Sequence, residues 1–104
     1  MSADLVVEAE LIDPGKPVPA LGMLHAIGLM RYRLERVIEG TYEGDELLVG
    51  HSGPDLSAPE FQTGARHRLE LVREFPAGAT VLSTFDTSER PALYCVGFTV
   101  LAPG

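Results

Sequence analysis

The sequence predicts a single all-β domain, a small antiparallel barrel or sandwich of five to six strands. Three observations predict it. Apolar and polar residues alternate along several segments, turns rich in glycine and proline separate these segments, and no amphipathic helix or internal repeat is found. The length of 104 residues is typical of one domain with one core. We therefore expect residues 1–104 to fold as one unit.

The first predicted strand covers residues 5–12, where Glu8 and Glu10 alternate with apolar residues. This alternation has the period of a half-buried strand, so Val7, Ala9 and Leu11 are expected to face the core. Residues 13–22 contain three prolines and two glycines. Because proline has no amide hydrogen to donate to a strand ladder, this segment is expected to be a loop.

The longest predicted strand begins at His25 and starts a hairpin that ends at Ser52, around which the other segments are expected to pack. Met30, Tyr32 and Leu34 share the apolar phase of this strand, and arginine and glutamate residues take the other phase. The alternation slips after Glu35, which predicts a β-bulge that bends the strand, as a small barrel needs.

Turn residues divide the rest of the chain into further short strands. Glycines at 40 and 44 within the acidic segment 39–46 indicate a hairpin loop. Strands are expected over residues 47–51, 65–74, 80–85 and 92–101, with His67 on the apolar face of its strand. The connection over residues 53–64 is expected to be irregular and held by Phe61.

The net charge of −7 disfavours nucleic acid and anionic membranes as partners, because binding either needs clustered cations. The positive charge is carried almost entirely by arginine, which suits paired positions. Four arginines are expected to pair with Glu35 and Glu70 across the sheet, namely Arg31, Arg33, Arg66 and Arg68. A single cysteine, Cys95, excludes an intrachain disulfide and is expected to be buried. The expected location is the cytoplasm.

The last predicted strand differs from the others because both of its faces are mostly apolar. Tyr94, Val96, Phe98 and Val100 alternate with a second apolar set, which comprises Leu93, Cys95, Thr99 and Leu101. A strand covered on both faces, or one that pairs across a dimer interface, has this composition. We interpret the second set as the interaction face.

Candidate catalytic residues gather around His51. Ser52 and Asp55 supply the residue types of a nucleophilic triad, but neighbouring strand residues point to opposite faces, so Ser52 cannot reach the His51 ring. His51 could instead act as a general acid or base at the barrel mouth. It would do so with Tyr42, Tyr32 or Glu60.

The histidine spacing does not predict a metal site. His25, His51 and His67 lie on separate predicted strands, and their spacing matches neither HxH nor HExxH. We therefore predict no metal and no cofactor.

The hairpin and the strands after it resemble small bacterial OB-like barrel domains. The resemblance rests on Tyr32, Val37, Ile38, Gly40, Tyr42, Gly44, Leu48, Val49 and His51, and on the later segments GARHRLEL and PALYCV. The layout is more distantly similar to the netrin-like barrel of tissue inhibitors of metalloproteinases, which insert an N-terminal cysteine into the zinc site of a protease. This chain begins Met1-Ser2-Ala3, so that activity is not implied. The resemblance implies a five- to six-stranded antiparallel OB-like barrel.

Two functions from different classes fit these observations. The first is a non-catalytic protein-binding or assembly module whose partner is another protein or a second copy, recognised through the C-terminal strand. The alternative is a small lyase, isomerase or cyclase that uses His51 in a barrel-mouth pocket.

Overall fold

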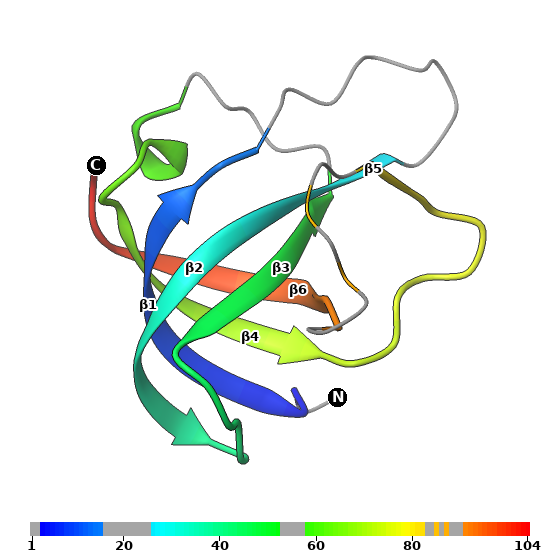
Figure 1. Ribbon diagram of the computed structural model, residues 1–104, viewed down its shortest axis with the longest axis horizontal. Helices are drawn as coiled ribbons and strands as arrows, with labels where there is room; N and C mark the ends of the chain where they lie inside the picture. Colours follow the sequence, from blue (N-terminus) through cyan, green and yellow to red (C-terminus); the bar gives the residue numbers. More distant parts are fainter. Residues whose placement is uncertain (1–2, 16–25, 53–57, 83–84, 86, 88–90) are drawn as a thin grey trace.

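Five strands close into a barrel and a sixth strand extends it (Figure 1). The computed structural model describes residues 3–15, 26–52, 58–82, 85, 87 and 91–104. The all-β prediction is confirmed, since no α-helix occurs in these ranges and one short 3-10 turn interrupts the strands. The elements are β1 (Leu5–Asp13), β2 (Ala26–Glu39), β3 (Glu46–Ser52), η1 (Pro59–Phe61), β4 (Arg66–Val72), β5 (Thr80–Leu82) and β6 (Leu93–Ala102).

The barrel strands follow the order β1-β2-β3-β6-β4, and β4 returns to β1. Four of these five contacts are antiparallel, but β3 and β6 are parallel and pair only at Val49 with Leu93 and Gly50 with Tyr94. The predicted antiparallel barrel is thus present, with one parallel contact inside the ring. Strand directions cannot alternate all the way around a closed ring with an odd number of strands, so one contact must be parallel. The short β5 lies outside the ring and pairs in parallel with the start of β2.

The bend in β2 lies where the sequence predicts it. Glu8 of β1 is opposite Arg36 and the next residue, Ala9, is opposite Leu34, so Glu35 is the extra residue. The hairpin glycines Gly40 and Gly44 both have positive φ, as tight turns that favour glycine do. The predicted start of the strand at His25 and most of the loop before it lie outside the described residues.

The apolar side chains that alternate along the barrel strands fill the barrel interior. Val7, Ala9 and Leu11 are fully buried, as predicted, and so are Met30 and Tyr32. Leu69 and Leu71 of β4 complete this layer, and Phe61 of η1 covers one end of it. Such a continuous core is what stabilises a domain of this size, because each buried side chain of this kind contributes about 1.5 to 3 kcal/mol.

The alternation of β6 changes phase at Val96. Leu71 of β4 pairs with Cys95, but the preceding Glu70 pairs with Gly97, so Val96 is an extra residue. Before this point Leu93 and Cys95 point into the barrel and are buried. After it Phe98 and Val100 take the inward phase, since they pair with the buried Leu69 and His67.

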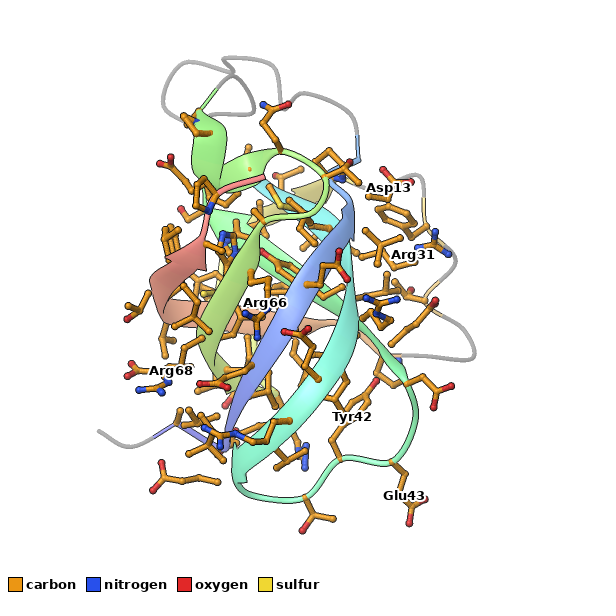
Figure 2. The ribbon with its side chains drawn as sticks, turned by 90° about the vertical axis from the view of Figure 1, so that its left-hand side faces the viewer. Asp13, Arg31, Tyr42, Glu43, Arg66 and Arg68 are labelled. Atoms are coloured by element: carbon orange, nitrogen blue, oxygen red, sulfur yellow. The ribbon has the colours of Figure 1, made fainter. Side chains whose placement is uncertain are left out.

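The outer face of β1, β2 and β4 carries alternating charges. Arg66 and Arg68 extend from β4 on the outside of the barrel (Figure 2). The predicted Arg66–Glu35 ion pair is present at 2.8 Å, but Arg68 and Arg36 both bind Glu8, and Arg33 binds Glu10. The prediction omitted β1, whose position between β2 and β4 brings its glutamates within reach of arginines on both sides.

Candidate functional site

Three buried polar side chains meet inside the barrel. The hydroxyl of Tyr32 lies 2.9 Å from Nε2 of His51 and 2.9 Å from Nδ1 of His67. The three residues come from β2, β3 and β4, where each occupies the inward phase of its strand. Tyr32 and His67 are fully enclosed and His51 is 4% exposed. One hydroxyl therefore satisfies a ring nitrogen of each histidine within the core.

Two phenylalanine rings cover this network. Phe61 and Phe98 contact the His51 ring with centroid separations of 5.1 and 5.5 Å. The same two rings lie 5.9 and 5.2 Å from the His67 ring. Phe61 is buried, whereas Phe98 is 40% exposed although it takes the inward phase of β6. Phe98 thus separates the network from solvent on the β6 side.

Burial keeps all three groups in their neutral forms at neutral pH. Desolvation lowers the pKa of His51 to about 3, and the nearby His67 adds to the shift. Desolvation also lowers the pKa of His67, although Glu60 opposes this change. Burial, together with Cys95, raises the pKa of the Tyr32 hydroxyl above its ordinary value. The network is therefore a set of neutral hydrogen-bonding groups.

Cys95 lies on the same inner surface and is not activated. Burial raises the pKa of its thiol to about 11, and Sγ donates a hydrogen bond to the carbonyl of Gly97 at 3.2 Å. A thiol with a raised pKa is a poor nucleophile, because the thiolate is the reactive form.

The structure brings together only part of the predicted catalytic set. His51 and Tyr32 are hydrogen-bonded, but Tyr42 lies at the β2–β3 hairpin, where its hydroxyl donates to the carbonyl of Glu46 at 2.6 Å (Figure 2). Tyr42 and the predicted interaction residue Leu93 both line a hollow at that end of the barrel, beside Arg73. Ser52 is exposed while His51 is buried, as the argument against a triad requires. His25 and Asp55 lie outside the described residues.

The predicted interaction set is divided by the phase change in β6. Leu93 and Cys95 lie in the core, whereas Thr99 and Leu101 are at the surface. We call residues 96–102 distal β6. Its exposed apolar side chains are Val96, Phe98, Val100 and Leu101, with exposures between 39% and 51%.

Distal β6 also has an open edge. Its residues hydrogen-bond to β4, while pairing with β3 ends at Tyr94 in the part of the chain that the structure describes. The amide and carbonyl groups on the other side of the strand therefore have no ladder partner among those residues. An apolar strand with an unpaired edge is a template for pairing with another chain.

Sequence reasoning placed His67 on an apolar strand face but missed its contact with Tyr32 and His51. The sequence did contain a signal for this contact. A tyrosine and two histidines each occupy a position where the alternation of their strand places an inward, apolar side chain. Buried polar groups need partners, and three of them on inward faces of one small barrel are expected to find each other. Phe98 was missed because the phase change in β6 was not anticipated.

Searches of protein-family models, curated proteins and solved structures found no match to this chain. Within the described residues, no group of three or more histidine, cysteine or acidic side chains could hold a metal ion. No helix in those ranges is long and apolar enough to cross a bilayer. The chemistry of this protein must therefore be argued from its own residues.

Proposed function

We propose that this protein is an assembly module that pairs with a second copy of itself through distal β6. The observation that carries the proposal is the combination of an unpaired strand edge with four exposed apolar side chains on the same seven residues. Either feature alone is common on protein surfaces. Together they match the edge strands that proteins usually protect or cover.

The strand lacks the devices that keep edge strands apart. None of the ten residues of β6 is charged, and proline is absent from it, whereas each of the other four barrel strands carries at least one charged residue. Proteins commonly prevent edge pairing with lysine, proline or inward-pointing charges. Their absence supports an edge that is paired in the assembled protein.

The absence of charge on distal β6 is compatible with a second copy as the partner. Two molecules of net charge −7 repel each other, so an uncharged surface is the one on which this repulsion opposes contact least. Distal β6 is such a surface. A two-fold axis near its centre would place the two strands antiparallel, so that the same apolar residues meet on both sides, as in other symmetric dimers.

We also propose that the fold is OB-like. The strand order, the single parallel contact between β3 and β6, and the incomplete pairing there support a partly open five-stranded barrel of that type. A distant netrin-like relationship belongs to the same proposal. Strand order alone does not carry a function, so the assembly proposal rests on distal β6.

The enzyme alternative has less support. A general acid or base must reach its substrate, but Phe61 and Phe98 cover His51, and desolvation has lowered its pKa far from neutrality. His51 lines neither the hollow beside Tyr42 and Leu93 nor the one beside Phe75 and Tyr94. The hydrogen bond between Tyr32 and His51 is better explained as satisfaction of buried polar groups.

The experiment compares two substitutions with the same change in chemistry. Leu101 and Ile38 are both 39% exposed, but Leu101 lies on distal β6 and Ile38 lies on β2. We expect sedimentation velocity to show a dimer for the unmodified protein and for Ile38→Glu, and a monomer for Leu101→Glu. A charge at Thr99 should also weaken the dimer.

Two results would contradict the assembly proposal. One is an unmodified protein that stays monomeric over the accessible concentration range. The other is a dimer that Leu101→Glu and Thr99→Glu leave intact while both variants remain folded by circular dichroism.

A further inference from the structure

The hydrogen-bond pattern of the buried network can be assigned from its own geometry. The Tyr32 oxygen carries one proton, so it can donate to one histidine and must accept from the other. Nε2 of His67 is buried without a hydrogen-bond partner among the described residues, while the backbone of Glu60 raises the pKa of the His67 ring. Because Nδ1 already faces the Tyr32 hydroxyl, we infer that the Glu60 carbonyl acts from the Nε2 side and favours a proton there.

With its proton on Nε2, His67 accepts the Tyr32 hydroxyl proton at Nδ1. His51 must then donate its Nε2 proton to the Tyr32 oxygen. The reverse arrangement would leave a lone pair of His67 Nε2 on the side where we infer the Glu60 carbonyl, which is unfavourable inside the core. The structure therefore assigns the Nε2–H tautomer to both histidines.

In this arrangement the remaining basic position is Nδ1 of His51. No hydrogen bond to that nitrogen is found among the described residues, and His51 is the one member of the network with any exposed surface. A proton added there would leave the three hydrogen-bonding partners as they are. It would, however, place a positive charge inside an apolar barrel.

Few groups could compensate such a charge. The titratable side chains that face the network are Tyr32 from β2, the two histidines themselves from β3 and β4, Cys95 from β6 and Glu60 from η1. Tyr32 and Cys95 are neutral. Glu60 acts on His67, where burial still prevails over its effect.

Distal β6 is the part of the wall whose displacement would hydrate the network. Its Phe98 ring touches both imidazoles, and the strand is paired on one side only. Displacing β1 or β2 would instead break ladders on both of their sides. Local opening occurs most readily at the element that the fewest contacts hold in place.

We propose that the Tyr32–His51–His67 network is a pH-sensitive latch, which holds distal β6 on the barrel while both histidines are neutral and releases it on acidification. The proposal deepens the assembly function and rests on it for its biological consequence, namely loss of the β6 interface at low pH. Hydrated histidines regain their ordinary pKa of 6.5. Between that value and its closed-state pKa of about 3, His51 favours the open form roughly tenfold more for every pH unit, and His67 acts in the same direction.

The decisive variant keeps the hydrogen bonds and removes the titration. Glutamine at 51 can donate from the position of Nε2, and asparagine at 67 can accept at the position of Nδ1. The double variant His51→Gln with His67→Asn should therefore retain the latch in its closed form at every pH. Its circular dichroism spectrum and melting transition verify that it is folded.

Native-state hydrogen exchange tests the latch apart from assembly. The measurement uses the Leu101→Glu background, so that dimer contacts do not protect the edge, and corrects for intrinsic exchange rates. Between pH 7.0 and 5.5 we expect the opening constant of distal β6 amides to rise roughly tenfold through His51, with His67 acting in the same direction, while amides of β1 change less. The double variant should show no such rise. An equal rise on β1, or the same rise in the double variant, would overturn the latch.

Two further measurements separate failure of the latch from failure of the assembly proposal. In the unmodified protein, ¹⁵N shifts of the imidazole nitrogens should report neutral Nε2–H tautomers for both histidines at pH 7.0, and a different tautomer would refute the assignment. Sedimentation should show a dimer that weakens at pH 5.5 in the unmodified protein but not in the double variant. A monomer at both pH values would refute assembly, whereas a dimer insensitive to pH would refute the latch.

Discussion

The barrel carries two polar systems, one on its inner face and one on its outer face, and β2 and β4 contribute residues to both. On β4, His67 points inward between Arg66 and Arg68, which point outward. The outer residues form ion pairs with neighbouring glutamates in solvent, where each pair contributes little. The inner residue shares a hydroxyl with a second histidine in the core, where an unmade hydrogen bond is expensive. Adjacent polar residues can therefore differ greatly in their effect on stability.

Removal of the Tyr32 hydroxyl should produce the largest effect. Tyr32→Phe leaves a ring nitrogen of His51 and one of His67 without partners inside the barrel. Each buried unsatisfied group costs about 1 to 3 kcal/mol, so we expect the free energy of unfolding to fall by about 2 to 6 kcal/mol. Urea denaturation followed by circular dichroism measures this change.

Tyr42→Phe is the matched control, because it removes the same atom from the hairpin. The Tyr42 hydroxyl donates to one backbone carbonyl, at Glu46, in a partly buried position. Its loss should cost about 1 kcal/mol. Equal effects of the two substitutions would show that the inner network is not a special contributor to stability.

Acidification should produce the next largest loss of stability, because it protonates the histidines on unfolding. The folded pKa of His51, about 3, lies below the unfolded value of 6.5, so the unfolded state binds more protons between these values. The stabilisation is complete above pH 6.5 and is lost as the pH falls toward 3. At pH 5 we expect a loss of about 2 kcal/mol from His51, and His67 contributes in the same direction.

The pH window separates the histidines from the outer ion pairs. A hydrogen bond from Arg68 lowers the pKa of Glu8 below 4.5, so its stabilisation is present above that value and is lost only in stronger acid. Urea denaturation at pH 7.0, 6.0 and 5.0 therefore measures the loss of stability caused by protonation of the histidines. A flat profile in the unmodified protein would contradict the inner network's role, and a flat profile is the expected result for His51→Gln with His67→Asn.

Weakening the ion pairs on the outer face should produce the smallest effect. Glu8→Gln weakens two ion pairs, to Arg68 at 2.9 Å and to Arg36 at 3.4 Å. Both arginine side chains are well exposed, although Glu8 itself is only 15% exposed. We therefore expect a loss smaller than that of Tyr42→Phe, and 1 M NaCl should reduce it further. A loss as large as that of Tyr32→Phe would reverse the ranking of the two systems.

Local alternation was sufficient to predict the strands and most of their faces. Alternating residues specify which side of a strand is buried without any knowledge of its neighbours, and this placed Val7, Tyr32 and His67 correctly. The bulge at Glu35 was predictable for the same reason, since an extra residue is visible as a slip in the pattern. His51 was chosen because it ends a strand, which is also local information.

Only the tertiary structure decided which strands meet, because that depends on closure of the whole ring. An odd number of barrel strands forces the parallel contact of β3 with β6, and this contact leaves distal β6 with an open edge. Tyr32 meets partners 19 and 35 residues away in the chain, a distance that no local pattern spans. The sequence by itself determined that polar groups would be buried and that the last strand would be apolar. Ring closure decided that the strand would cover those groups and that its far part would pair on one side only.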